Sequence, residues 1–549
     1  MLLAAAAPRV FLADPARNAE AILSCARRAE KQGAGLLLLP ELCLTGHCGH
    51  LLPHGWLRTR AEAALTQLAA QTAALRCALV VSFPGEAGRP EYALLQNGMT
   101  TQLDAGRQLR LTLREGDGAR AQTLCLLDSL QPLPEADIAL YPFAQPWTVG
   151  SRDWLCNTAQ FYTREAHGTL VCAGAGYGES TTDAAWKGIS LVCRSGRALA
   201  YEEAYACADT AATAQLTVPD FSINNPEESQ PWLPLDAAAR AMTLEEILCI
   251  QSSALRGRME AVGIQQLVLN LSGGLDSTLA LLVATRALDE LGLPRENLTC
   301  LVLPGFGTGP RTLGNALALA EAFHVRCREI SIVADVTAHL AHIGHGGAQD
   351  VTYENAQARE RTQIALDIAN MAGGMMLGTG NMSEAALGFA TFGGDTVAQY
   401  NLNIGIPKTI VRELVLYEAR KLRGEAGALL RDVHATPVSP ELIPGQITED
   451  IVGPYALHDF FLYWWLVGGE DDAVIEARAK RAFAGVFTPD EIRHWLSVFI
   501  RRFFAAQFKR SCAVDGPAPL SLSLSPRTGW RMPSDVPLSG LSEERREPS

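Results

Sequence analysis

Short apolar runs and helix-spaced apolar positions alternate along the first two fifths of the chain. The start of the chain is apolar and reads as a buried first strand, and the helix-spaced stretches are 15–31, 60–75 and 153–166. Apolar runs of four to eight residues between turn signals are typical of buried strands. We expect strands at 10–13, 35–39, 78–83, 123–127, 138–141, 169–173 and 189–193, and therefore a layered α/β domain.

The second half repeats a stricter rhythm of strand, turn and helix. Strands are expected at 266–271, 299–303, 327–332 and 374–377, and helices at 243–261, 277–292, 311–323 and 354–371. This order is typical of a doubly wound parallel sheet of the Rossmann type. Between the halves, the stretch 223–236 is polar, rich in proline and without period. We expect a first domain at 1–222, a linker at 223–236, a second domain at 237–536 and a flexible tail at 537–549.

Composition narrows the function classes. The chain has 549 residues, 48% of them hydrophobic, which is enough for two or three packed cores. Its formal net charge of −13 argues against a general nucleic-acid binder, which needs a basic surface. The apolar start lacks the basic residue of a signal peptide, and the apolar run 460–468 is too short to span a membrane. We expect a soluble cytoplasmic protein whose 13 cysteines are reduced and bind no zinc.

The strongest chemical signal is a glycine-rich turn between a strand and a helix. It consists of Ser272, Gly273, Gly274, Leu275, Asp276 and Ser277. Two glycines allow close approach of the backbone to an anion, and the helix start supplies free N–H groups. A carboxylate beside a phosphate cradle most often holds Mg2+. The turn lacks the lysine of kinase-type phosphate loops and resembles the pyrophosphate loop of ATP pyrophosphatases, which adenylate their substrates.

Further strings narrow the resemblance to one family. The region 243–535 resembles the synthetase domain of glutamine-dependent NAD+ synthetases, which belongs to the adenine nucleotide alpha hydrolase type. The matching strings are LPGFGT (303–308), ENAQARERT (354–362), GTGNMSE (378–384), YNLNIGIPKT (400–409), SPELIPGQITED (439–450), FKRSCAVDGP (508–517) and LSPRTGWRMPSD (524–535). One departure is Leu313, which stands where close relatives carry a lysine.

The resemblance implies a reaction and a role for individual residues. It implies that ATP activates the carboxylate of deamido-NAD as an acyl-adenylate, and that ammonia then releases AMP. The glycine-rich turn and Thr379 would bind ATP, Asp276 and Glu384 would hold Mg2+, and Lys408 would steady phosphate charge. The residues that would contact deamido-NAD are Asn355, Glu384, Phe389 and Lys509. The family also implies a homo-oligomer, a dimer or an octamer.

The region 8–215 resembles the nitrilase-like glutaminase domain of the same enzymes, an αββα sandwich. LLLLPELCLTGHCG (36–49) and AGYGESTTDAAWKG (175–188) carry this match. Active members use glutamate as base, lysine for the oxyanion and cysteine as nucleophile on glutamine. Glu41 matches the base, but residues 101–121 contain no lysine, and Leu126 takes the place of the cysteine.

We therefore expect a degenerate glutaminase site, with ammonia as the nitrogen source. The alternative is a fully glutamine-dependent enzyme in which Cys125 serves as a displaced nucleophile, with Arg110 or Lys187 replacing the lysine. A shift by one residue along a strand turns the side chain to the opposite face. Two positions where the family binds glutamine carry Gln145 and Ser151 here.

Three other functions compete less well. A nitrilase-type amidohydrolase would need an intact glutamate, lysine and cysteine set. An RNA-modifying ATP pyrophosphatase would need a basic RNA-binding module. A scaffold without catalysis would have no need of the SGGLDS, GTGNMSE and FKR strings.

Overall fold

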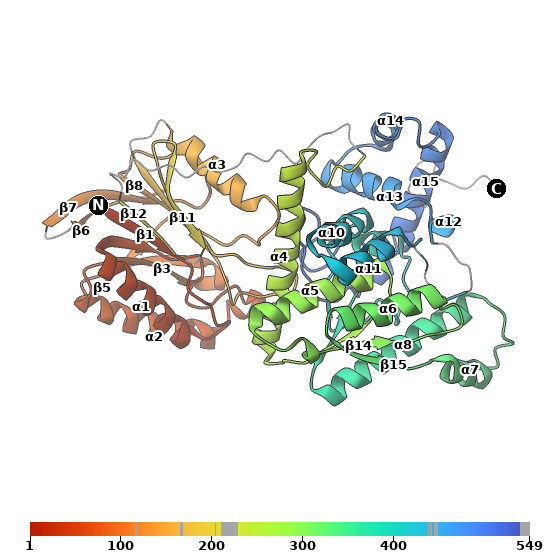
Figure 1. Cartoon of the computed structure of the whole chain (residues 1–549). Coiled ribbons are helices and arrows are strands. Elements are labelled where there is room, and N and C mark those ends of the chain that lie inside the picture. Colours follow the sequence, from red (N-terminus) through yellow and green to blue (C-terminus); the bar gives the residue numbers. More distant parts are fainter. Residues whose placement is uncertain are drawn as a thin grey trace. The chain divides into compact units, whose positions relative to one another are not determined.

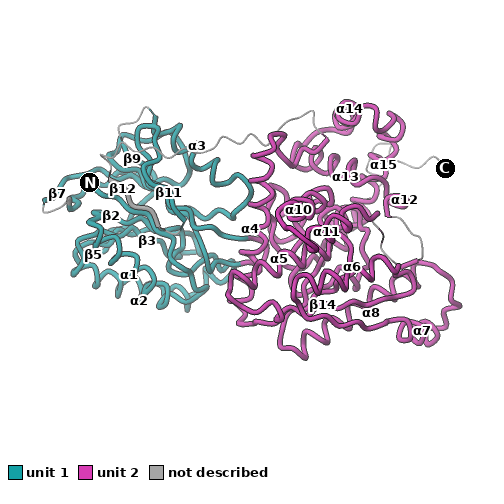
Figure 2. The backbone as a smooth tube through the Cα atoms, viewed as in Figure 1, with its two compact units in different colours: residues 1–180, 185–221 teal, residues 181–184, 222–549 magenta. Residues whose placement is uncertain are grey.

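A computed structural model describes residues 1–115, 118–164, 168–203, 205–209, 229–437, 439, 442–443 and 448–537. The chain divides into two compact units, shown in different colours in Figure 2. Unit 1 contains residues 1–180 and 185–221, and unit 2 contains residues 181–184 and 222–549. Parts of the expected linker and of the expected tail lie outside the described residues.

Unit 1 contains two six-stranded sheets, with the strand orders β12-β1-β2-β3-β4-β5 and β11-β10-β9-β8-β7-β6. The strands of the first sheet are β1 (Leu2–Ala6), β2 (Ala34–Leu38), β3 (Ala78–Pro84), β4 (Pro90–Gln96), β5 (Met99–Leu103) and β12 (Tyr205–Asp209). The second sheet consists of β6 (Gln108–Glu115), β7 (Gly118–Leu126), β8 (Ile138–Phe143), β9 (Thr169–Gly174), β10 (Ile189–Arg194) and β11 (Arg197–Glu203). The α-helices of unit 1 are α1 (Pro15–Gln32), α2 (Gly55–Gln71) and α3 (Ser151–Thr163).

Three apolar layers hold unit 1 together. One lies between α1, α2 and the first sheet, a second between the two sheets, and a third between the second sheet and α3. Strands buried on both faces read as continuous apolar runs, which is why β2 and β9 are visible in the sequence. The expected αββα sandwich is confirmed (Figure 1).

One expected strand of unit 1 is wrong. Residues 10–13 form a turn, in which Ala13 has a φ of +57°. The side chain of Asp14 then accepts a hydrogen bond from the Arg17 amide and caps α1. The apolar run therefore ends in a helix cap, and the first strand lies earlier, at Leu2–Ala6, as the apolar start indicates.

Unit 2 is built on a five-stranded parallel sheet with the order β15-β14-β13-β16-β17. The strands are β13 (Leu267–Asn270), β14 (Leu298–Val302), β15 (Arg326–Glu329), β16 (Met375–Gly378) and β17 (Tyr400–Asn401). In chain order this is 3-2-1-4-5, so right-handed connections place helices on both faces. The expected doubly wound sheet is confirmed.

The helices of unit 2 are more numerous than the four expected, because α7 and the helices after residue 372 were not predicted. They are α4 (Ala237–Val262), α5 (Leu275–Leu291), α6 (Pro310–Ala322), α7 (Val333–His342), α8 (Val351–Ala372), α9 (Met382–Leu387), α10 (Lys408–Lys421), α11 (Gly424–Ala435), α12 (Thr448–Val452), α13 (Tyr455–Leu462), α14 (Asp472–Ala482), α15 (Pro489–Ala505) and α16 (Gln507–Arg510). No helix among the described residues is long and apolar enough to cross a membrane.

Residues 181–184, which precede β10 in the chain, are part of unit 2. The guanidinium of Arg527 donates two hydrogen bonds to the Asp183 carboxylate, at 3.0 and 2.6 Å. The Tyr400 hydroxyl donates to the carbonyl of Thr181 at 2.9 Å, and the Gly516 amide donates to that of Thr182. Unit 2 is therefore assembled from two separate stretches of sequence.

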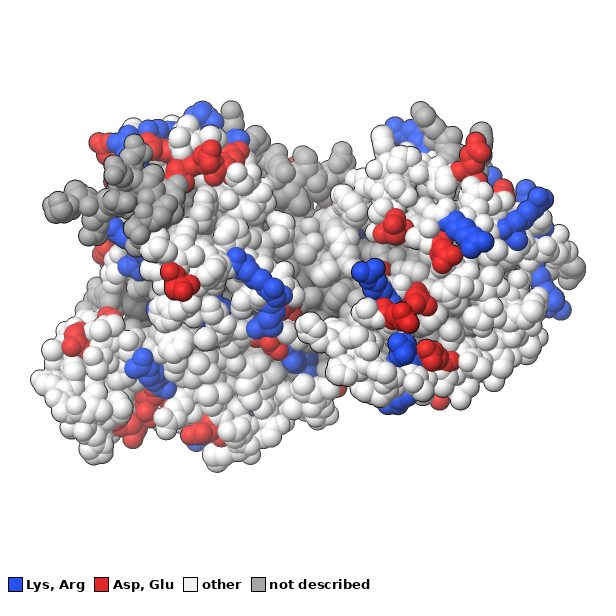
Figure 3. Space-filling view, turned by 180° about the vertical axis from the view of Figure 1, so that it is seen from behind, with Lys and Arg blue, Asp and Glu red and all other residues white. Residues whose placement is uncertain are grey.

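Charged side chains are dispersed over the surface. On the face shown in Figure 3, lysines and arginines lie among acidic and uncharged residues. The described residues on that face form no continuous basic surface.

Candidate active site

The strand order of the sheet in unit 2 indicates where a ligand would bind. The strand order reverses at β13, which pairs in parallel with both β14 and β16. In open α/β sheets, ligands bind beyond the carboxyl ends of the strands at such a reversal. The glycine-rich turn follows β13, and Thr379 follows β16. Two of the strings singled out in the sequence therefore meet at this edge.

The glycine-rich turn has a conformation that requires glycine at one position. Gly273 has a φ of +83°, and a Cβ atom there would lie 2.3 Å from the carbonyl oxygen of Thr312. The Ser272 and Ser277 hydroxyls lie 3.1 Å apart and hold the turn closed. Helix α5 begins at Leu275, so its unpaired N–H groups and its positive end point beyond the turn. This arrangement suits an anion.

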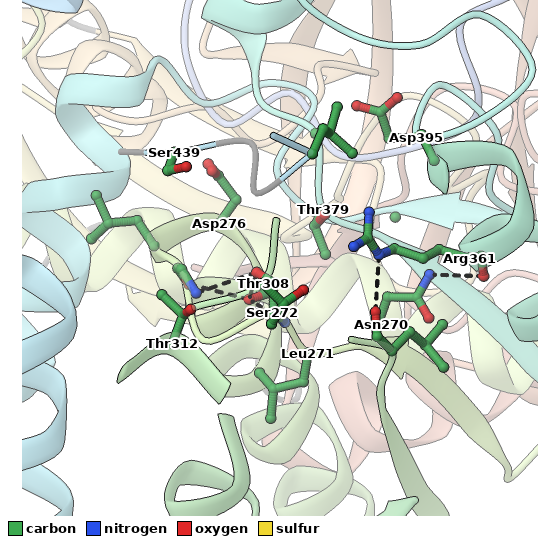
Figure 4. A pocket seen from close by; sticks show the side chains of 18 of the residues that line it. Asn270, Leu271, Ser272, Asp276, Thr308, Thr312, Arg361, Thr379, Asp395 and Ser439 are labelled. Carbon is green, nitrogen blue, oxygen red and sulfur yellow. Dashed lines mark hydrogen bonds between the residues drawn. The ribbon is translucent and has the colours of Figure 1, made fainter. Parts of the chain in front are cut away.

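The turn lines a cavity of about 270 Å3 (Figure 4). Helix α8 contributes Arg361 to its wall, and the residue after β16 contributes Thr379. Most of the residues expected at the site are brought together here: Ser272, Gly274, Leu275, Asp276, Ser277, Thr379, Glu384, Phe389 and Lys408. Leu313, at the position of a lysine in relatives, also lines the cavity.

Lys408 forms a bridge between two carboxylates at the cavity wall. Its ammonium group donates hydrogen bonds to Asp276 and to Glu384, the latter at 3.2 Å. The Lys408 side chain is only 2% exposed. Burial alone would lower the pKa of Lys408, but the two carboxylates outweigh it and hold the pKa above its ordinary value. Lys408 therefore stays charged and neutralises a pair of acids that would otherwise repel each other.

The two carboxylates also fit a hard divalent cation. Asp276 and Glu384 converge on one point, which the Lys408 ammonium group occupies. Carboxylate oxygens are ligands that Mg2+ prefers, and Mg2+ is commonly held by one or two of them together with substrate phosphates. Among the described residues no group of three or more His, Cys, Asp or Glu side chains is placed to hold a metal ion. A cation here would take its remaining ligands from phosphate and water.

Two asparagines that the sequence analysis did not single out support this cluster. The Asn381 side chain donates to Asp276 Oδ1 at 2.8 Å and accepts from the Glu384 amide, capping α9. Asn403 donates to the carbonyl oxygens of Asp276 and Thr379, at 2.9 and 3.1 Å. Asn381 lies inside GTGNMSE and Asn403 inside YNLNIGIPKT, so the strings already contained them.

Three expected site residues lie outside the cavity wall. Gly273 lies behind it in the turn. Asn355 accepts a hydrogen bond from the Thr391 hydroxyl at 2.8 Å, and Thr391 itself lines the cavity. The ammonium group of Lys509 donates to the carbonyl oxygens of Gly388 and Ala390, at 2.7 and 2.6 Å. Asn355 and Lys509 thus hold the loop around Phe389 in this structure.

Unit 1 places Glu41 in a second cluster of polar residues. The Glu41 carboxylate accepts from the Tyr92 hydroxyl at 3.0 Å, and it lies 3.3 Å from Nε2 of His47. The other ring nitrogen of His47 lies 3.1 Å from the buried Glu179. Burial alone would lower the pKa of His47, but Glu179 and Glu41 raise it to about 9. A protonated His47 therefore balances the charge of these two acids at neutral pH.

The candidate nucleophile lies on β7. Cys125 is 1% exposed and packs with Cys156 in the layer between the second sheet and α3. Its neighbour Leu126 points into the layer between the two sheets. Burial raises the pKa of the Cys125 thiol, so the reactive thiolate is disfavoured. The alternation along β7 matches the one-residue shift expected from the sequence.

Neither of the two cations considered as substitutes for the missing lysine forms an ion pair with Glu41, which is bonded to Tyr92 and His47. Arg110 is exposed on β6. Lys187 pairs with Glu203 at 2.9 Å and lies 4.1 Å from the Trp147 ring, with its side chain only 12% exposed. Lys187 is therefore not a solvated surface charge. Gln145 and Ser151 line a cavity of only about 10 Å3, which is space for roughly one water molecule.

Comparison with known proteins gives a consistent match. A family model for NAD synthase matches residues 248–482. The chain is 32% identical to a glutamine-dependent NAD(+) synthetase of Mycobacterium tuberculosis strain H37Rv, over 97% of this chain and 96% of the relative. It is 30% identical to a protein of the same name from Mycobacterium leprae, with the same coverage.

Solved structures show the same fold. A glutamine-dependent NAD(+) synthetase from Cytophaga hutchinsonii superposes with a TM-score of 0.77 at 19% identity, covering 99% of both chains. A glutamine-dependent NAD+ synthetase from Acinetobacter baumannii, solved in complex with ADP, gives a TM-score of 0.66 at 21% identity, covering 97% of this chain and 98% of the other.

Proposed function

This chain belongs to the family of glutamine-dependent NAD+ synthetases, carbon–nitrogen ligases, and from that premise we propose that it uses ATP to convert deamido-NAD to NAD+. One observation carries the proposal. The SGGLDS turn lies at the strand-order reversal of a parallel sheet, and Lys408 joins its Asp276 to Glu384. A phosphate cradle and a charge cluster that share one cavity suit the cleavage of a nucleoside triphosphate.

The proposed reaction needs no protein nucleophile. The nicotinate carboxylate of deamido-NAD attacks the α-phosphorus of ATP, and pyrophosphate leaves toward the turn that begins at Ser272. N–H groups at the start of α5 stabilise the leaving pyrophosphate. Ammonia then attacks the acyl-adenylate and AMP leaves. Phe389 lines the cavity, and in this proposal it contacts the nicotinate ring. Positioning and charge neutralisation supply the rate.

Mg2+ is part of the proposal. Asp276 and Glu384 would hold it, and a bound Mg2+ would neutralise charge on the phosphates. Lys408 would then be released from the carboxylates, and its ammonium group could bind a phosphate oxygen. The backbone around Lys408 is fixed by a hydrogen bond from its amide to the Ser383 hydroxyl, at 2.8 Å, so only the side chain would need to move.

For the nitrogen donor, the comparisons favour glutamine. Both mycobacterial relatives match over nearly their full length and are named glutamine-dependent. This supports the alternative of the sequence analysis better than its main expectation of a degenerate site. In this version of the proposal, Cys125 is the nucleophile, Glu41 is the base, and unit 1 releases ammonia from glutamine.

Free ammonia is the second candidate, and specific observations in unit 1 favour it. The Cys125 thiol is buried among apolar side chains. Glu41 is hydrogen-bonded by Tyr92 and lies beside His47, and Lys187 pairs with Glu203 instead. A cavity of about 10 Å3 beside Gln145 holds no space for a glutamine side chain. A site of this kind would need rearrangement before it could hydrolyse an amide.

One assay tests the activity and the donor together. Purified protein is given deamido-NAD, ATP and Mg2+ with either ammonium or glutamine, and NAD+ is measured. The proposed function requires NAD+ with at least one donor, and Asp276→Asn should abolish it. The absence of NAD+ with both donors would refute the proposed function.

The donor is then assigned with two matched cysteine variants. Cys125→Ala and Cys156→Ala both remove a buried thiol from the same apolar layer. If glutamine is the donor through Cys125, only Cys125→Ala loses the glutamine reaction while keeping the ammonium reaction. If NAD+ forms with ammonium alone in the unmodified protein, free ammonia is the donor.

Location and assembly complete the proposal. We expect the enzyme to act in the cytoplasm as a homo-oligomer. Size-exclusion chromatography with light scattering would give a mass above 59.0 kDa, the mass of one chain.

A further inference from the structure

A buried carboxylate that the proposed reaction does not use lies next to the charge cluster. Asp459, on α13, is 2% exposed. One of its oxygens accepts a hydrogen bond from the Ser383 hydroxyl. The other accepts from the amide and the hydroxyl of Thr409, at 2.8 and 2.7 Å. Its own carbonyl oxygen accepts from the indole of Trp232 at 3.0 Å.

The partners of Asp459 are the sequence neighbours of the residues that form the charge cluster. Ser383 directly precedes Glu384 on α9, and Thr409 directly follows Lys408 on α10. One carboxylate therefore joins the first turns of two helices that are distant in sequence. Since Ser383 also accepts a hydrogen bond from the Lys408 amide, the three segments form a closed set of contacts.

Helix α13 also contacts the side chain of Lys408, through Tyr455. Tyr455 lies one turn before Asp459 on α13, and the centroid of its ring is 5.5 Å from the ammonium group of Lys408. Residues four apart on a helix share a face. This face of α13 thus contacts Lys408 through Tyr455 and holds its backbone through Asp459 and Thr409.

Burying a carboxylate costs free energy that hydrogen bonds must offset. Burial raises the pKa of Asp459 to about 6, while its donors act in the opposite direction. An apolar side chain at this position would leave the Ser383 hydroxyl and both Thr409 donors without this acceptor, and it could not tie the two helices together. What Asp459 provides is a fixed distance between two helix starts.

We propose that Asp459 is a positioning residue for NAD+ synthesis, which holds Ser383 and Thr409 so that Glu384 and Lys408 meet at Asp276. The proposal rests on the function proposed above. It assigns to α13 a part in catalysis without contact to either substrate. A misplacement of about 1 Å at reacting groups can lower a rate about 100-fold, so loss of this tie should affect turnover more than substrate affinity.

The decisive variant is Thr409→Val, which removes one hydroxyl donor from Asp459 and keeps the volume and the amide donor. Thr409→Ser, which retains both donors, is the conservative variant. Thr285→Val is the control, because Thr285 is a buried threonine of unit 2 whose hydroxyl bonds only to carbonyls of its own helix. Thr409 is half-buried, so the control substitution is made in the more buried place of the two. Asp459→Asn is made in parallel and replaces one of the two acceptor oxygens with an NH2 donor, so the three hydrogen bonds cannot all be kept.

We expect Thr409→Val to lower kcat about tenfold and to raise the Mg2+ concentration for half-maximal rate, with the KM for deamido-NAD changed much less. Thr409→Ser should remain near the unmodified enzyme. If Thr409→Val lowers kcat no more than Thr285→Val does, the positioning role is refuted. A loss explained entirely by a smaller folded fraction, measured by thermal unfolding, would also refute it.

The failure of this inference can be told apart from failure of the proposed function. If the unmodified protein makes no NAD+ with either donor, the proposed function fails. The crystal structure of Thr409→Val then decides whether Asp459 sets the geometry. Movement of Lys408 away from Asp276 or Glu384 supports the positioning role, and an unchanged bridge overturns it.

Discussion

Replacement of Lys408 by methionine gives the sharpest test of the charge cluster. Methionine fills the space of the lysine stem, so the change removes the ammonium group and leaves little cavity. Asp276 and Glu384 then face each other without a counter-charge. We expect the variant to be less stable than the unmodified protein and to gain more stability from Mg2+.

The loss of stability expected for Lys408→Met follows from the exposure of the three charged side chains. Removing one partner of a buried ion pair costs roughly 3–5 kcal/mol. The side chains of Asp276 and Glu384 are 19% and 17% exposed, so water reaches them in part and one carboxyl can take up a proton. We therefore place the cost near the lower limit, about 3 kcal/mol. Lys421→Met is the matched control, because Lys421 lies on the same helix with 42% of its side chain exposed. It should cost about 1 kcal/mol or less.

Thermal unfolding with and without Mg2+ measures both effects. At a tenfold excess over its Kd, a ligand that binds only the folded state adds about 1.4 kcal/mol. In the Lys408→Met variant Mg2+ binds without competition, whereas in the unmodified protein it must displace the lysine. The stabilisation should therefore be larger in the variant. A variant as stable as the unmodified protein, or equal stabilisation of both by Mg2+, would refute the reasoning.

Three other predictions concern the two clusters and the substrate contact. His47 has a folded pKa of about 9, above its unfolded value, so its stabilising contribution is complete below about pH 6.5 and is lost as pH rises through 9. The free energy of unfolding is measured in urea for the unmodified protein and for His47→Gln. The difference between the two should shrink by at most about 3 kcal/mol from about pH 6.5 to about pH 9, and a constant difference would contradict this. Gly273→Ala should weaken ATP binding, measured by calorimetry, and lower the free energy of unfolding by about 1–3 kcal/mol, because the new Cβ would lie 2.3 Å from a carbonyl oxygen. ATP binding equal to that of the unmodified protein would refute the requirement for glycine in this turn. Phe389→Ala should raise the KM for deamido-NAD roughly tenfold and leave that for ATP unchanged, and an equal rise in both would argue against stacking.

The folds of both units could be predicted because their central strands are buried on both faces. Such strands read as apolar runs, so the strands that became β2, β9 and β13 are found in the sequence within one or two residues. Strand β5 is largely exposed and polar, so no apolar run marks it. Strand β6 alternates Leu109, Leu111 and Leu113 with polar residues, a period-two pattern that is not an apolar run. The failed strand at 10–13 shows the limit of the method, since an apolar run fits a cap as well as a strand.

The site was predictable in its parts, but its internal contacts were not. The strings around Asp276, Glu384 and Lys408 were recognisable, and the parallel sheet explains why they meet. Burial of Lys408 could not be predicted, because lysine is usually exposed. Its burial is offset by Asp276 and Glu384, two acids that are distant from it in sequence. Asp459 was missed because its partners lie 76 and 50 residues away, beyond any local pattern.

The segment 181–184 has a consequence for how this enzyme can be divided. A gene fragment that began after the linker would encode the parallel sheet and every residue of the proposed ATP site. It would still lack Asp183, one of the two acids that pair with Arg527, and the carbonyl oxygens that accept from Tyr400 and Gly516. A truncated protein expressed for crystallisation or screening would therefore lack four residues that belong to its own compact unit.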